Sequence, residues 1–317
     1  MLEARIYRIL PLLVFLLNPV VVFGYGLDLD TLNEEKKAHY DSVFQDSLKA
    51  FEEELVELQD TILESDDEGR RVQAMRNYIP TLVEALQVPG SIYHPFEEVQ
   101  FMFTHMPEDE SFRLYNWVME FDDGEHRYYG AIQKNTTDEF ELYPLTDASE
   151  DLPDKPENKI LDHENWYGAL YYEMLQVEDY DGNAYYTLLG WDGYDRHSQL
   201  KMVDVLTFDH DDRPQFGAPV FLYKGENEER ERQDRVFFEY SEDAVMSLNV
   251  AEGTDIIVFD QLVPLAGSAR GGRTEMVPDG SYSSFNFREG TWLERKNPFD
   301  TFEEFYGREG EDVPVFE

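Results

Sequence analysis

Histidine and carboxylate side chains are concentrated in two stretches of the chain, residues 162–164 and 192–197. Such side chains supply the nitrogen and oxygen ligands that divalent cations take in proteins. A predicted strand over 166–177 starts beside the first stretch, and the returning strand over 184–191 ends at the second. Because antiparallel neighbours run in opposite directions, we expect both stretches at one end of the sheet. The candidate cation ligands are Asp162, His163, Glu164, Asp192, Asp195 and His197.

A plainer interpretation of these residues stays open. The chain holds 68 Asp and Glu residues, so carboxylates crowd every loop whether or not an ion binds. A second group, residues 209–212 with Asp179 and Asp181, is expected at the opposite end of the sheet, about 25 Å away. The two groups therefore cannot form one site. Beyond a weakly held divalent cation, no cofactor is predicted.

The standard motifs of catalysis and phosphate binding each fail at a particular position. Residues 179–183 begin like a calcium loop, but Gly182 comes too early and Gly190 stands where a bidentate glutamate belongs. Residues 267–272 lack the lysine that ends a phosphate loop, so we expect a flexible loop there. No catalytic residue is predicted.

A helical segment is predicted over residues 28–90, because apolar side chains recur every three or four residues from Tyr40 to Ile62. Pro80 needs no N–H bond in a first helical turn and therefore predicts the start of a further short helix over 80–87. Amphipathic helices mostly cover cores, so we expect the apolar stripe to pack on a sheet. A face for assembly with a partner is the alternative.

Residues 91–317 are predicted to form an antiparallel β domain with a charged C-terminal tail. Strands over 112–121 and 126–133 flank an Asp-Gly turn that is typical of a hairpin. The strands over 166–177 and 184–191 repeat this pattern and are apolar on both faces, which predicts a central position. The fold class is α+β, mainly β, with the helical segment packed on a large antiparallel meander, either a sandwich or a partly closed barrel. We expect helices and sheet to form one unit.

Residues 1–24 are typical of a secretory signal peptide. Arg5 and Arg8 precede an interrupted apolar run, and the chain turns acidic directly after it. The run is shorter than the roughly 20 apolar residues of a membrane span, although a retained anchor is the alternative. We therefore expect an extracytoplasmic protein, periplasmic or secreted, after removal of the signal. The sequence has no Cys, so packing rather than disulfides must hold the domain.

The formal net charge of −42 restricts the partners of this protein. So acidic a surface repels phosphates, and neither nucleic acid nor an anionic membrane surface is an expected partner. Cations or a salty environment are the natural partners. A host that lives in strong brine and an ordinary acidic exported protein both fit the composition.

Seven stretches of the chain together resemble a family of uncharacterised exported bacterial proteins: 77–86, 89–91, 126–133, 166–172, 203–208, 216–221 and 277–282. The resemblance covers most of the chain that follows the signal. It implies export to the bacterial envelope and a single unit that runs from the helices through the sheet. It implies no activity and assigns no functional residues.

Two functional classes follow from these observations. Aromatic residues make up 15% of the chain while catalytic motifs fail, which favours a non-enzymatic extracytoplasmic binding or structural module with an apolar or sugar ligand. The alternative is a carboxylate-dependent, glycosidase-like hydrolase, which needs two carboxylates that face each other across a cleft.

Monovalent salt should stabilise the folded protein. Like charges on one compact body repel one another and oppose folding. Screening is weak at 0.1 M salt, where the Debye length is about 10 Å, and strong at 1 M, where it is about 3 Å. We expect the melting temperature, measured by calorimetry, to rise as sodium chloride increases over this range. A flat or falling melting temperature would contradict the repulsion argument.

Overall fold

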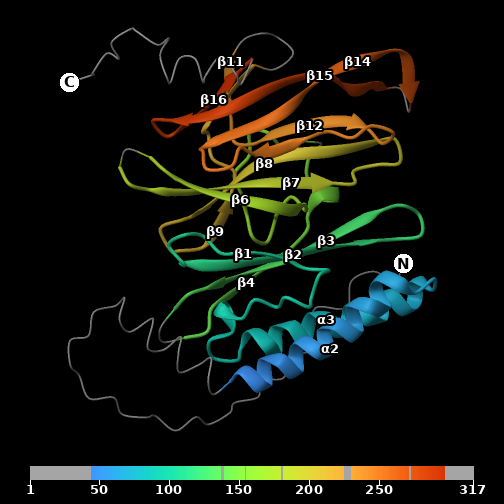
Figure 1. Cartoon of the computed structure of the whole chain (residues 1–317), viewed down its shortest axis with the longest axis vertical. Helices are drawn as coiled ribbons and strands as arrows, with labels where there is room; N and C mark the ends of the chain where they lie inside the picture. Colours follow the sequence, from blue (N-terminus) through green and yellow to red (C-terminus); the bar gives the residue numbers. More distant parts are fainter. Residues whose placement is uncertain are drawn as a thin grey trace.

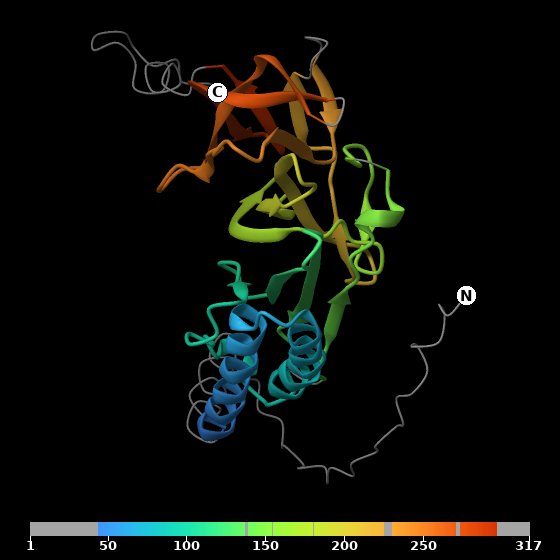
Figure 2. The same ribbon diagram turned by 90° about the vertical axis from the view of Figure 1, so that its right-hand side faces the viewer.

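The computed structural model describes residues 44–136, 139–153, 155–179, 181–224, 230–270 and 273–296. In this part of the chain, a pair of helices and three β-sheets are stacked as four layers along the long axis of the molecule (Figure 1). We call the sheets helix-proximal, central and distal. The layers broadly follow chain order, with the helices at one end and the last strands at the other (Figure 2). Residues 1–24 and Tyr40 lie outside the described residues.

The helical layer consists of α2 (Gln45–Glu64) and α3 (Glu68–Leu86), which lie side by side (Figure 2). The Asp67 side chain caps α3 by accepting a hydrogen bond from the amide of Arg70. The prediction of a new helix at Pro80 was wrong, because α3 continues through this residue. Pro80 lies on the exposed side, where water can satisfy the carbonyl that its missing N–H leaves free.

The predicted apolar stripe of α2 faces the core: Leu48, Leu55 and Ile62 are buried, and Phe51 and Leu58 are half-buried. Its inward positions recur every three or four residues, as a helix packed on a core requires. Two of them are polar: the Glu52 carboxylate accepts a hydrogen bond from the amide of Glu98, and the Gln59 side-chain carbonyl accepts one from the amide of Phe101. The stripe therefore fastens the loop that follows α3 as well as the sheet. The buried residues of α2 are Leu48, Glu52, Leu55, Gln59 and Ile62.

The helix-proximal sheet has the strand order β1-β2-β3-β4 and is antiparallel throughout. Alternate residues of β2 serve two cores: Phe112 and Leu114 face the central sheet, whereas Tyr115 and Trp117 face the helices. The predicted hairpin around the Asp-Gly turn is confirmed as β2 and β3. The elements are β1 (Phe103–His105), β2 (Phe112–Glu120), β3 (His126–Lys134) and β4 (Leu142–Leu145), with the short 3-10 helices η1 (Ser91–Tyr93) and η2 (Ser149–Asp151).

The central sheet has the order β5-β9-β8-β7-β6, and β12 pairs with the first half of β8. Leu188 and Met202 pack toward the helix-proximal sheet, whereas Leu189 and Val203 pack toward the distal sheet. The prediction of a central position is thus confirmed for the strand over 184–191, whereas the strand over 166–177 lies at the edge of this sheet. The strands are β5 (Leu161–Asp162), β6 (Leu170–Glu178), β7 (Ala184–Asp192), β8 (Ser198–Phe208), β9 (Pro214–Phe216) and β12 (Val236–Ser241).

The distal sheet has the order β11-β10-β16-β15-β14-β13. Only β10 and β16 run parallel; the other pairs are antiparallel. The loop predicted over 267–272 was partly wrong, since β14 continues to Arg270 and β15 begins at Arg273. The cross-strand pairing of these two strands carries them beyond the rest of the sheet. The strands are β10 (Phe221–Lys224), β11 (Arg230–Gln233), β13 (Leu248–Val250), β14 (Ile256–Arg270), β15 (Arg273–Arg288) and β16 (Thr291–Arg295).

The predicted fold class, α+β and mainly β, is confirmed. The sheets stack face to face and do not close into a barrel. Helices and helix-proximal sheet share one cluster of buried side chains, which includes Leu55, Tyr78 and Trp117. Among the described residues, no helix has the length and apolar character to span a membrane.

Removal of one buried α2 side chain should weaken the whole fold. Leu55 is fully buried in the core shared by helices and sheet, so Leu55→Ala should lower the free energy of unfolding by about 3 kcal/mol. Leu63→Ala on the same helix is the matched control, because Leu63 is 61% exposed and should change stability by less than about 0.5 kcal/mol. Urea unfolding of both variants measures the difference. An equal loss of unfolding free energy in the two variants would show that burial of Leu55 does not stabilise the fold.

Candidate functional site

The six predicted cation ligands do not share one end of the central sheet. Asp162 in β5 pairs with Gln215 of β9, which pairs with Thr207 near the end of β8. Asp192 pairs with Leu200, near the start of β8. Thr207 lies seven positions after Leu200 in β8, which corresponds to about 23 Å along the strand. The predicted juxtaposition is therefore corrected: β5 joins the far edge of the sheet through β9, instead of lying beside the start of β6.

Most of the six residues form their own turns. The Asp162 carboxylate accepts hydrogen bonds from the amides of Glu164 and Asn165. His163 contacts the Pro144 carbonyl through Nδ1 at 3.2 Å. At the other end of the sheet, the Asp195 carboxylate accepts hydrogen bonds from the amides of His197 and Ser198. Aspartate side chains commonly accept such hydrogen bonds from nearby backbone amides in turns.

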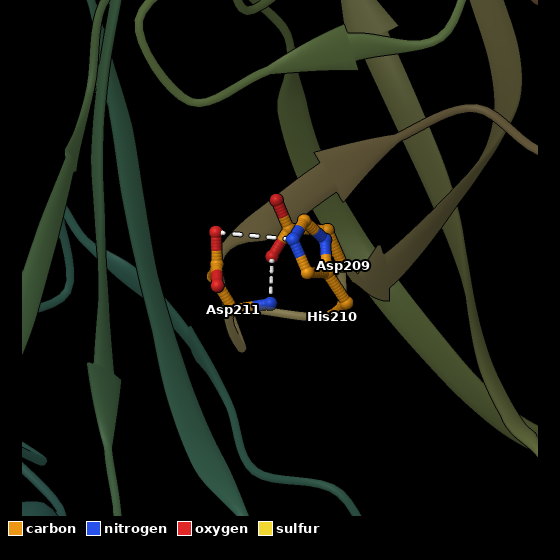
Figure 3. A group of neighbouring side chains, drawn as sticks. All are labelled: Asp209, His210 and Asp211. Atoms are coloured by element: carbon orange, nitrogen blue, oxygen red, sulfur yellow. Dashed lines mark hydrogen bonds and ion pairs between the residues drawn. The ribbon is translucent and has the colours of Figure 1, made fainter.

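Among the described residues, one group of three potential ligands has all its ligand atoms within 4.8 Å of one another: Asp209, His210 and Asp211 (Figure 3). It occupies the turn between β8 and β9. The Asp209 carboxylate accepts hydrogen bonds from the amides of Asp211 and Arg213, and His210 lies 3.4 Å from Asp211. His210 and Asp211 are exposed, so the turn itself accounts for this group.

Asp192 is the exception among the predicted ligands, because it is buried at the end of β7. One carboxylate oxygen accepts hydrogen bonds from the Tyr128 hydroxyl at 2.9 Å and the Tyr194 amide at 2.8 Å. The other accepts from the Tyr167 hydroxyl at 2.7 Å. The Tyr128 hydroxyl in turn accepts from the Gly193 amide at 2.8 Å. A strand of the helix-proximal sheet is thus tied to the end of a central strand.

Burial controls the protonation of this cluster. It raises the pKa of the Asp192 carboxyl above the ordinary value of 3.8, while the hydrogen bonds that this carboxyl accepts oppose the rise. Burial also raises the pKa values of the Tyr128 and Tyr167 phenols, with the Asp192 charge adding to the effect. Both phenols therefore remain protonated donors at neutral pH.

A second carboxylate, Asp147, lies against the same cluster. It accepts hydrogen bonds from the Tyr128 amide at 3.0 Å and from the Ser149 amide and hydroxyl at 3.1 and 2.6 Å. Its charge contributes to the raised pKa of Asp192. Gly168 makes room for it, since a Cβ atom there would come within 2.4 Å of the Asp147 side chain. Residue 168 must therefore be glycine for this carboxylate to occupy its place.

A cavity of about 690 Å³ opens above these residues, and we call it the Asp192 pocket. Tyr128, Leu145, Tyr167 and Asp192 are its buried residues. Asp147 and Tyr194 are half-buried. Its more exposed lining is charged, with carboxylates in excess of cations. These charged residues are Glu125, Arg127, Glu150, Asp151 and Lys155. The pocket can accept hydrogen bonds from a ligand and offers apolar ring surface, but it opposes anions.

Sequence reasoning found only Asp192 of this pocket and assigned it to a different set of partners. Tyr128 and Tyr167 fall within predicted strands and Asp147 within none, and no role at a site was predicted for any of the three. A local signal exists in the Trp-Asp-Gly end of the β7 strand, where an aspartate follows a long apolar run. Its partners come from elements that are distant in sequence, which no local pattern reveals.

The carboxyl groups should titrate in an order set by their surroundings. Asp192 should titrate above 3.8, whereas hydrogen bonds from backbone amides hold the pKa of Asp209 below 3.8. Since the folded-state pKa of Asp192 exceeds its unfolded value, its share of the unfolding free energy should rise as the pH falls toward 3.8. Carbon-13 carboxyl NMR, with Asp192→Asn to assign the signal, measures both midpoints. A midpoint for Asp192 at or below that of Asp209 would overturn this account.

Comparison with protein-family models, curated proteins and solved structures found no match for this chain. The resemblance to exported bacterial proteins stays a prediction. The contacts of the described residues are therefore the basis for the functional proposal.

Proposed function

We propose that this protein is an exported, non-enzymatic binding module whose Asp192 pocket holds a neutral polyhydroxylated ligand, such as a carbohydrate. The observation that supports it most is a cavity of about 690 Å³ that combines tyrosine rings with carboxylates. Cavities of this size suit small ligands, and a few fixed polar groups give them specificity. The signal-like residues 1–24 support an extracytoplasmic location.

The tyrosine rings of the pocket are held in place before any ligand arrives. The hydroxyls of Tyr128 and Tyr167 are both bonded to Asp192, so neither ring can turn without breaking a buried hydrogen bond. These two rings are almost fully buried and form a rigid floor. The half-buried Tyr194 supplies ring surface against which the C–H face of a sugar can pack, and the fixed floor limits the side-chain entropy lost on binding.

The charged lining suits hydroxyl groups and opposes acidic ligands. The exposed carboxylates of Glu125, Glu150 and Asp151 can accept hydrogen bonds but cannot donate them. Sugar hydroxyls can donate hydrogen bonds to these carboxylates, whereas the carboxylates would repel phosphates and acidic sugars. A neutral ligand is therefore favoured.

A glycosidase-like hydrolase is the second candidate, favoured by the raised pKa of Asp192 beside a second carboxylate, Asp147. Enzymes of that kind pair a protonated acid with an ionised partner. However, both oxygens of Asp192 already accept hydrogen bonds from the protein, and so do both oxygens of Asp147. A catalytic acid must reach the glycosidic oxygen, so we favour a binding function over hydrolysis.

Neutral oligosaccharides should bind the protein, and the pocket lining should determine the affinity. We expect a glycan array to select neutral over acidic sugars. In calorimetry with the best array ligand, Tyr194→Ala and Glu150→Ala should each weaken binding about tenfold, since each removes one contact. The matched control is Tyr282→Ala, because Tyr282 is an exposed tyrosine of β15 outside the pocket lining.

Two outcomes would contradict the binding proposal. Selection of acidic glycans alone would show that the charge argument fails. Release of reducing sugar that Asp192→Asn abolishes would favour the hydrolase instead.

A further inference from the structure

A second hollow of about 1120 Å³ lies on the other side of the β2–β3 hairpin, and we call it the hairpin groove. The end of α2, the β2–β3 turn and the β7–β8 turn bound it. Figure 1 shows these three segments on the same side of the stack. His126 and Gly193 border the groove, and His126 also lines the Asp192 pocket. We propose that the hairpin groove binds a basic, amphipathic peptide segment of a partner protein.

The groove has an apolar floor that a peptide side chain can cover. Phe101, Phe121 and Trp191 are half-buried in its lining. Leu63 at the end of α2 is 61% exposed, although most leucines of the described core are almost fully buried. Aromatic side chains supply much of the energy at protein interfaces, and this floor presents three of them together with a free leucine.

The rim of the groove is acidic beyond what its own cations neutralise. Its two arginines are already engaged: Arg71 pairs with Asp122 at 2.7 Å and donates to the Ser65 carbonyl, and Arg196 donates to the Asp123 carbonyl. The carboxylates of the rim are exposed, and they favour a ligand that carries positive charge. The carboxylate residues are Glu64, Asp66, Glu120, Asp122, Asp123, Asp195 and Glu242.

The end of α2 adds to the attraction for cations. A helix C-terminus carries a partial negative charge, which a basic residue in the last turn normally offsets. The last turn of α2 has no such residue. Arg71 from α3 supplies one donor to this end, and a lysine or arginine of a bound peptide would supply more.

The two hairpin turns that form one wall are locked together. The His126 ring packs edge-on against Trp191, with ring centroids 5.4 Å apart. Gly193 allows this contact, because a Cβ atom there would come within 2.3 Å of the His126 ring. The groove therefore exists before the peptide binds, and little binding energy is spent on shaping it.

Charge selects a basic protein segment over other occupants. A second copy of this chain carries a net charge of −42 and would be repelled, as would nucleic acid or an anionic membrane. A bare metal ion does not fit, since among the described residues the only converging ligand group is Asp209–Asp211, outside the groove. A peptide that alternates basic and apolar residues satisfies both rim and floor.

The probe for this test is a fluorescein-labelled peptide of alternating lysine and leucine with one tryptophan, followed by anisotropy in 0.1 M salt. We expect the triple variant Glu64→Gln, Asp66→Asn and Glu242→Gln to weaken binding about tenfold. The matched control, Asp181→Asn, Asp211→Asn and Glu252→Gln, removes the same charge from exposed sites outside the groove and should change binding less than about threefold.

A second pair of variants tests the apolar floor. Leu63→Ser should weaken binding about tenfold, whereas Val245→Ser, at a residue that is 89% exposed and outside the groove, should leave it unchanged. Equal weakening by the two triple variants would reduce the interaction to general charge attraction and overturn the proposal. The same holds if a lysine–glycine peptide binds as tightly as the lysine–leucine peptide.

Discussion

The fold depends on one buried ion pair inside the central sheet. Arg235 and Asp204 are both fully buried, 3.2 Å apart. A buried charge is costly unless its remaining bonds are made, so this pair holds its neighbours in one arrangement. Asp204 also accepts hydrogen bonds from the Tyr171 hydroxyl and the Val205 amide. The guanidinium group donates to three backbone carbonyls, those of Pro156, Lys159 and Phe216. The segment before β5 is thereby fastened to β9, which places Asp162 at the far end of β8 from Asp192.

Stacking leaves little of the central sheet open to ligands. Both of its faces are covered by other sheets, so functional surface can form only where hairpin ends from adjacent layers meet. The β2–β3 and β7–β8 turns meet in this way, and their contact through His126 and Gly193 separates the Asp192 pocket from the hairpin groove. One clamp between two layers therefore shapes both hollows, although the two hollows offer different chemistry.

Acidity alone is a poor guide to sites in this protein. Asp179 and Asp209 are half-buried residues of turns, and Asp279 is an exposed residue of β15. The carboxylate of each accepts nearby hydrogen bonds, and these bonds lower its pKa. Their negative charge stabilises a turn and needs no ion. Burial acts in the opposite direction and raises the pKa of Asp192 and of Asp234. Carboxylates of the same type thus differ in proton affinity because of their surroundings, which a count of acids does not register.

Local patterns in the sequence determined the first helix, the hairpins and the central position of β7, because three-to-four and two-residue periodicities record which faces are buried. They did not determine that α3 continues through Pro80. The proline cannot donate the backbone hydrogen bond of a helix interior, and the packing of α3 before and after this residue outweighs that loss. Nor could they place Asp162 relative to Asp192, because the pairing of β5 with β9 joins residues more than fifty positions apart. The Asp192 pocket required residues of β3, of the end of β7 and of the segment before β6 to converge. Tertiary structure decided that convergence, because buried hydroxyls and carboxylates are stable only where each finds a partner.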